Sequence, residues 1–156
     1  MEPAPVSSST GSARSAANPI LRRGRAAAER EASVYELKIV TQMAAAHQLR
    51  EFSGKCENLH GHNWKIEIYV TGQELGSNGI LIDFKLVKDS ANKIIQDLDH
   101  TFLNDLKPFE GINPSSENIA RFVFSSLSRE LNTDQLKVSK VTAWESDSAC
   151  ATYMEP

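Results

Sequence analysis

The sequence predicts an α+β domain whose elements follow the order β-β-α-α-β-β. Apolar and polar residues alternate over residues 35–39 and 64–70, and strands are again indicated over 136–144 and 149–153, which is typical of half-buried strands. Between these regions, residues 83–131 carry apolar side chains at intervals of three and four, which is typical of amphipathic helices. Strands grouped on either side of two helices favour an antiparallel sheet with both helices on one face.

Two strands are predicted before the helices. The apolar positions of the first are Tyr35, Leu37 and Ile39, and an unbroken strand places His47 on the same face. The second ends near Gly72, and its apolar positions are Trp64, Ile66, Ile68 and Val70. His60 and His62 share the parity of those residues. Both strands therefore direct their histidines toward the covered face of the sheet.

Two helices and two closing strands complete the predicted order. Asp83 is placed to cap the first helix, whose apolar positions are Phe84, Val87, Ala91, Ile94, Ile95 and Leu98. Asn113 as cap and Pro114 at the first helical position begin the second helix. Its apolar stripe is Ala120, Val123, Phe124, Leu127 and Leu131. Strands follow over residues 136–144 and 149–153, and a slip in apolar parity near Lys140 indicates a β-bulge.

Composition indicates one globular domain preceded by a polar segment. The chain has 156 residues, of which 40% are hydrophobic, as is ordinary for a globular domain. Its net charge is -3, and it lacks the clustered basic residues that nucleic-acid binding needs. No stretch is apolar for long enough to span a bilayer. Residues 1–33 are rich in Ala, Ser, Pro and Arg, which predicts a disordered N-terminal extension before a domain over 34–156.

The cellular compartment is predicted from the cysteines and the extension. Cys56 and Cys150 are too few for a disulfide framework, so a reducing compartment, the cytoplasm, is predicted, and Cys150 is expected to pack as a small side chain. The Arg and Ser content of the extension is also that of an organellar transit peptide, although composition favours a plain tail.

His47, His60 and His62 predict a metal site. A single histidine on an apolar strand face is more often a core residue, but three that converge favour metal binding. Zinc is favoured over iron because no carboxylate of a facial triad is obvious. Three protein ligands leave the fourth tetrahedral position open, as catalytic zinc requires.

The residues alone leave two alternatives open for Cys56. It is either a fourth ligand that closes a structural zinc site, or a thiol whose pKa is lowered by a nearby zinc ion so that it acts as a base. For four other residues the simpler interpretation is a charge at a helix end or in solvent, and these are Asp99, His100, Glu117 and Glu145.

Short motifs occur in a fixed order along residues 35–153. They are Ala45-Ala46-His47, Cys56-x₃-His60-Gly61-His62, Ile82-Asp83-Phe84, Leu98-Asp99-His100, Leu103-Asn104, Pro114-x-x-Glu117-Asn118 and Trp144-Glu145. In this order the chain resembles the family of 6-pyruvoyl-tetrahydropterin synthases and 6-carboxy-tetrahydropterin synthases. The resemblance implies that residues 34–156 form a tetrahydropterin synthase domain.

The resemblance also implies a tunnelling fold, in which the sheets of several subunits join into a barrel. Two such rings stack, commonly as a homo-hexamer, with active sites between subunits. The implied site residues are the zinc ligands His47, His60 and His62, the proton acceptor Cys56, the relay pair Asp99 and His100, the pterin anchor Glu145, which also supports the relay, and the substrate-binding residue Glu117.

The spacing of the cysteine motif selects a branch of this family. Three residues separate Cys56 from His60, as in queuosine-pathway enzymes of 7-deazapurine biosynthesis. That resemblance implies zinc-dependent conversion of 7,8-dihydroneopterin triphosphate to 6-carboxy-5,6,7,8-tetrahydropterin, with release of acetaldehyde and triphosphate.

Three alternatives to this reaction stay open. Glu57 follows the cysteine directly, as in relatives that cleave the side chain to 6-hydroxymethyl-dihydropterin for folate synthesis, so that activity is one alternative. Formation of 6-pyruvoyl-tetrahydropterin is the second. The third is not enzymatic, namely a pterin-binding or structural zinc protein.

Overall fold

The structure, a computed structural model, describes Met1, residues 33–51 and residues 58–156. The compact unit is Ser33–Pro156. Nearly all of the predicted N-terminal extension lies outside the described residues, and so do Cys56 and Glu57.

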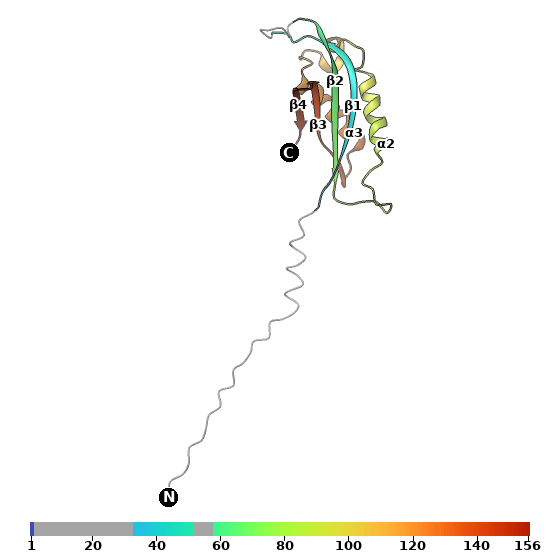
Figure 1. The fold of residues 1–156 in the computed structure, drawn as a ribbon, viewed down its shortest axis with the longest axis vertical. Helices are drawn as coiled ribbons and strands as arrows, with labels where there is room; N and C mark the ends of the chain where they lie inside the picture. Colours follow the sequence, from blue (N-terminus) through green and yellow to red (C-terminus); the bar gives the residue numbers. More distant parts are fainter. Residues whose placement is uncertain (2–32, 52–57) are drawn as a thin grey trace. The chain divides into compact units, whose positions relative to one another are not determined.

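The described chain forms a four-stranded antiparallel sheet with two helices, in the order that the sequence predicts (Figure 1). The strands are β1 (Tyr35–His47), β2 (His60–Gly72), β3 (Leu136–Ser146) and β4 (Ala149–Met154), and they neighbour one another in that order. Between β2 and β3 come α2 (Phe84–Gln96), two short 3₁₀ turns (Leu103–Asp105 and Lys107–Phe109) and α3 (Ser116–Leu131). α2 packs against β1, while α3 packs against β3, β4 and α2.

One face of the sheet meets the helices and forms the core. On β2, the residues with the predicted apolar parity are completely buried, and these are Trp64, Ile66, Ile68 and Val70. Side chains from both helices join the same cluster, among them Val87, Ala91, Ile119, Val123 and Leu127. Because side chains alternate across a strand, burial of these positions also fixes His60 and His62 on the helix-covered face.

The bulge predicted near Lys140 is confirmed. Tyr69 pairs with Lys140 and Val70 with Val138, so Ser139 has no partner of its own on β2. A second irregularity lies between Trp144, which pairs with Cys150, and Ser146, which pairs with Ala149. A bulge bends a strand and redirects the neighbouring side chains, and this second one contains Glu145.

The predicted start of the second helix is wrong by two residues. Ser115, not Asn113, is the N-cap of α3, and its hydroxyl accepts a hydrogen bond from the backbone N–H of Asn118 at 3.4 Å. Asn113 instead pairs through its side-chain amide with the backbone N–H and carbonyl of Arg50, at 2.8 and 2.9 Å. Pro114 precedes the helix and leaves its carbonyl free for another partner.

Three side chains expected to be covered are exposed, and one of them is Tyr35, the first residue of β1, at 45%. Phe84 is the first residue of α2 and is 55% exposed, because the helix begins before it reaches the covered face of the sheet. Cys150 pairs with Trp144 on the face of β4 that points away from the helices, and its thiol is free. The alternation of Ala151 and Tyr153 toward the helices explains why Cys150 faces outward.

β1 and β4 are the two edge strands of the sheet. The outer edge of β1 is partly covered near its end, where Ala46 donates to the carbonyl of Thr101 at 2.9 Å and His100 donates to that of Ala44 at 2.6 Å. Within residues 33–51 and 58–156, no strand pairs with the remainder of that edge or with the outer edge of β4. None of the helices in this part of the chain has the length and apolarity to cross a bilayer.

Candidate metal centre

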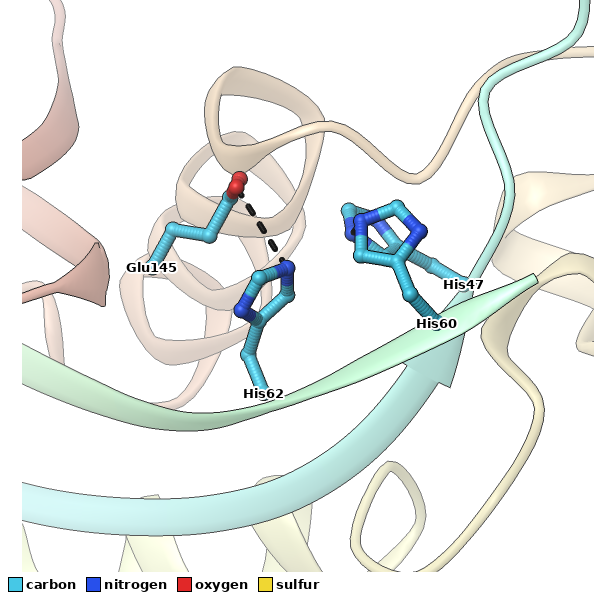
Figure 2. A group of neighbouring side chains, drawn as sticks. All are labelled: His47, His60, His62 and Glu145. Atoms are coloured by element: carbon cyan, nitrogen blue, oxygen red, sulfur yellow. Dashed lines mark hydrogen bonds and ion pairs between the residues drawn. The ribbon is translucent and has the colours of Figure 1, made fainter. Parts of the chain in front are cut away.

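The end of β1 and the start of β2 bring three histidines together at one end of the sheet. His47 is the last residue of β1 and pairs directly with His60, the first residue of β2. Figure 2 shows these two rings side by side, with His62 and Glu145 facing them. One ligand atom from each of the four residues lies within 4.8 Å of all the others. The predicted convergence of the histidines is therefore confirmed, and Glu145 joins them.

Backbone carbonyls determine which nitrogen of each histidine carries the proton. The Nδ1–H of His47 donates to the carbonyl of Pro114 at 2.8 Å, and that of His60 donates to the carbonyl of Asn58 at 2.7 Å. A carbonyl can only accept, so the proton lies on Nδ1 in both rings. Each Nε2 then presents a lone pair, which is the form in which a histidine binds a metal.

The two Nε2 atoms lie in a position that needs a cation. They are 3.0 Å apart, and because each Nδ1 donates to a carbonyl, lone pairs on the two Nε2 atoms would face each other. That arrangement is repulsive unless a positive charge lies beside both atoms. Adjacent ligands of a tetrahedral zinc ion are about 3.3 Å apart, given zinc–nitrogen distances of about 2.0–2.1 Å. The spacing of His47 and His60 thus fits a shared metal ion.

His62 supplies a third nitrogen of the same kind. Its Nε2 is buried and has no hydrogen-bond partner among the described residues. Burial lowers the pKa of His47, which is buried, and of His62, which is half-buried, and the rings of both lie beside Trp64. A lowered pKa keeps an imidazole neutral at physiological pH, and a neutral ring with an unused buried nitrogen is a ready metal ligand.

Glu145 lies over the histidines from β3. Its Oε1 is 3.4 Å from His62 Nε2, and its Oε2 accepts a hydrogen bond from the hydroxyl of Ser116 at 3.1 Å. Ser116 and the carbonyls of Pro114 and Asn58 were not predicted as site groups. Backbone carbonyls leave no signal in a sequence, but Ser116 lies inside the Pro114-x-x-Glu117 motif, so it could have been considered.

Asp99 and His100 form a separate pair beside the outer edge of β1. The carboxylate of Asp99 accepts from the backbone N–H of Ala44 at 2.7 Å, and it lies 2.9 Å from His100 Nδ1. The N–H of Ala44, followed by His100, holds the pKa of Asp99 below its usual value. His100 has a φ of 55° and an 81% exposed side chain. Within the described residues, no hydrogen bond or ion pair joins this pair to the histidine cluster.

The other two predicted site residues are not part of the cluster as described. Glu117 lies in the first turn of α3 with an exposed side chain. Cys56 lies outside the described residues, and its predicted role as base remains a prediction. The four clustered residues therefore define the candidate metal centre within the described residues.

The fold and the cluster define a class of protein: an α+β domain with three imidazoles and a carboxylate that could hold a metal ion at one end of its antiparallel sheet. Sequence comparison gives the family. Residues 36–156 match the family described as 6-pyruvoyl tetrahydropterin synthase, and the chain belongs to it.

Individual relatives agree with this assignment. The chain is 30% identical over 135 residues to the 6-carboxy-5,6,7,8-tetrahydropterin synthase of Haemophilus influenzae, covering 70% of this chain and 92% of the relative. It is 32% identical over 89 residues to the dihydroneopterin monophosphate aldolase of Pyrococcus furiosus, covering 57% and 72%. The solved structure of Caenorhabditis elegans 6-pyruvoyl tetrahydropterin synthase superposes with a TM-score of 0.71 at 25% identity, covering 80% of this chain and 97% of that one.

Proposed function

We propose that this protein is a zinc-dependent lyase that converts 7,8-dihydroneopterin triphosphate to 6-carboxy-5,6,7,8-tetrahydropterin, releasing acetaldehyde and triphosphate. The observation that carries the proposal is the convergence of three imidazoles beside a carboxylate, in a chain of this family. The spacing of Cys56 and His60, and the name of the Haemophilus influenzae relative, favour the carboxy product. The product belongs to queuosine biosynthesis.

His47, His60 and His62 hold the zinc ion in this proposal. When bound, zinc acts as a Lewis acid toward the side-chain oxygens of the substrate and makes the adjacent C–H more acidic. Trp64 is completely buried and its ring lies 5.2 Å from that of His47, so apolar surface backs the ligands. Exclusion of water on that side strengthens the electrostatic effect of a bound cation.

The proton transfers are assigned to side chains around this centre. Cys56 is the general base that removes the acidified proton, and Asp99 with His100 forms the relay that carries protons to and from the substrate side chain. Glu145 holds the pterin ring, because a carboxylate matches its adjacent N–H and amino donors with two parallel hydrogen bonds. Glu117 is proposed as a further substrate-binding residue on the basis of its motif.

We also propose that the protein is a homo-hexamer whose sheets join into a barrel and whose active sites lie between subunits. Two observations support this arrangement. The outer edges of β1 and β4 are long enough to pair with other strands, and unpaired strand edges are templates for association. The relay residue His100 is exposed beside the β1 edge and apart from the histidines. A second copy that brings its own histidines to this edge would complete the site.

The proposed lyase needs Cys56 as a free thiol. A reducing compartment, the cytoplasm, meets that need, and it remains our proposal for the location of the protein.

The second candidate is cleavage of the substrate side chain to 6-hydroxymethyl-dihydropterin. Glu57 next to Cys56 supports it, and so does the similarity to the Pyrococcus furiosus aldolase. Both reactions begin by removing a proton near the metal, so they differ in the bond that breaks afterwards.

Product analysis separates the candidates. The purified zinc-loaded protein is incubated with 7,8-dihydroneopterin triphosphate, and the products are identified by mass spectrometry. We expect 6-carboxy-tetrahydropterin together with acetaldehyde, and their absence in the Cys56→Ala variant at unchanged zinc content. A hydroxymethyl or pyruvoyl product would instead assign the corresponding alternative, and no turnover with bound pterin would indicate a binding protein.

A further inference from the structure

The carboxylate of Glu145 lies where a fourth metal ligand would be. Its Oε1 is 3.4 Å from His62 Nε2, and the Nε2 atoms of His47 and His60 are 3.0 Å apart. Both separations match the edge of about 3.3 Å between ligands of a tetrahedral zinc ion. All four ligand atoms lie within 4.8 Å of one another, so one ion between them could contact all four residues.

The close approach of the Glu145 carboxylate to His62 is not a hydrogen bond. Although Oε1 is within ion-pair distance, His62 Nε2 has no hydrogen-bond partner among the described residues. Figure 2 shows the His62 ring and the Glu145 carboxylate facing each other across this contact, beside the other two histidines. Buried polar atoms without partners are rare in folded proteins, and a cation shared with the Glu145 carboxylate would give His62 Nε2 a partner.

The two oxygens of Glu145 have different surroundings. The hydroxyl of Ser116 donates to Oε2 at 3.1 Å, which turns Oε1 toward His62 and the cluster. Hydrogen bonds to the distal atom of a ligand are the usual way in which proteins orient metal-binding side chains. Ser116 therefore presents one oxygen of the carboxylate as a single ligand atom.

The backbone around Glu145 leaves the carboxylate able to move. The β2–β3 ladder ends at Trp144, and the β3–β4 pairing is irregular between Trp144 and Ser146. The side chain of Glu145 is 29% exposed, so solvent reaches it. A small shift of Glu145 would thus break no regular ladder bond.

We propose that Glu145 is an exchangeable fourth ligand: its Oε1 binds the metal in the substrate-free protein and is released to the pterin ring when substrate arrives. This inference deepens the proposed function and rests on it, because the same carboxylate is the pterin anchor there. The coordination position vacated by Oε1 becomes the one that the substrate side chain occupies. Substrate binding and opening of the metal site are then one event.

Metal affinity of the full chain tests this inference without turnover. Zinc affinity is measured by competition with a chromogenic chelator for the wild type, Glu145→Gln and Glu110→Gln. Glu110 is exposed and outside the cluster, so its variant removes the same charge without touching a ligand. We expect zinc binding weakened at least on the order of tenfold in Glu145→Gln and unchanged in Glu110→Gln. Equal affinity of Glu145→Gln and wild type overturns the proposal.

Cobalt substitution gives a second, spectroscopic measurement. The visible spectrum of bound Co²⁺ reports its ligands, so replacement of the carboxylate by water in Glu145→Gln should change that spectrum. Ser116→Ala keeps the carboxylate but removes its orientation, and we expect a smaller loss of zinc affinity. If Glu145→Gln does not fold, unchanged affinity and an unchanged cobalt spectrum in Ser116→Ala overturn the proposal.

These outcomes separate this inference from the proposed function. A wild-type protein that binds no metal contradicts the proposed lyase itself. A wild-type protein that binds zinc and forms the carboxy product, while Glu145→Gln keeps full zinc affinity, contradicts only the exchangeable ligand.

Discussion

Two of the clustered histidines, His47 and His60, are each oriented by a single hydrogen bond to a backbone carbonyl. Pro114 fixes the proton of His47, and Asn58 fixes that of His60. His47 is only 1% exposed, so water does not compete for the hydrogen bond between its ring and Pro114. Each ring is therefore held in one tautomer before a metal arrives, which reduces the entropy lost on binding.

Replacing His60 tests the metal site at the level of one residue. His60→Ala removes one of two nitrogens that lie 3.0 Å apart, so we expect the purified variant to lose its zinc and its activity. Zinc content is measured by inductively coupled plasma mass spectrometry. His100→Ala is the control, because His100 is exposed and outside the cluster, and it should keep its zinc. Full zinc occupancy in His60→Ala would refute the ligand assignment.

At the scale of elements, the start of α3 organises the metal centre. Three consecutive residues act there in turn: Pro114 accepts from His47, Ser115 caps the helix, and Ser116 donates to Glu145. The long β1–β2 ladder supplies the opposite side, since its register pairs His47 with His60 and Ala45 with His62. The centre is therefore the meeting point of a helix start and a strand pair.

Removing the cap of α3 should reduce stability. Ser115→Ala leaves the N–H of Asn118 without its side-chain acceptor, and the loss of an N-cap typically lowers the free energy of unfolding by about 1 kcal/mol. Urea denaturation of both proteins measures the difference. Ser128→Ala is the matched control on the same helix, because the buried Ser128 hydroxyl has no partner among the described residues and its removal should not destabilise. If Ser115→Ala is as stable as wild type, Ser115 is not the effective cap.

At the scale of the whole molecule, the separation of His100 from the histidine cluster bears on assembly. Asp99 and His100 are fixed to β1 by backbone hydrogen bonds, so a side-chain rotation alone does not carry the pair to the metal centre. The proposed barrel resolves this by supplying the relay from one subunit and the metal centre from another. Activity would then belong to the assembly and not to the single chain.

Mixing two inactive variants tests this division between subunits. Cys56→Ala and His100→Ala are each expected to be inactive as pure oligomers. Unfolded together and refolded as mixed oligomers, they should regain part of the wild-type activity, because some sites then combine an intact Cys56 with an intact His100 from different subunits. Native mass spectrometry confirms mixing and reports the number of subunits. Mixed oligomers without any activity would place both residues of a site on the same subunit.

The sequence by itself determined the order of the elements and the faces of the strands. Period-two alternation is decided by which residues must leave water, so it predicted the burial of Trp64 and its neighbours and the common face of His47, His60 and His62. The sequence also predicted the family, because short motifs occur in a fixed order along the chain. The family match over residues 36–156 confirms that prediction.

Only the tertiary structure decided which of the remaining groups meet the histidines. Glu145 joined them and Asp99 with His100 did not, although both lie in motifs of equal clarity. The difference arises because Glu145 sits on a strand whose register is set by long-range pairing, whereas residues 99–102 bond to the outer edge of β1. The carbonyls of Pro114 and Asn58 and the hydroxyl of Ser116 also became visible only in three dimensions. Local patterns fix the face of a side chain, but contacts between distant segments fix its partners.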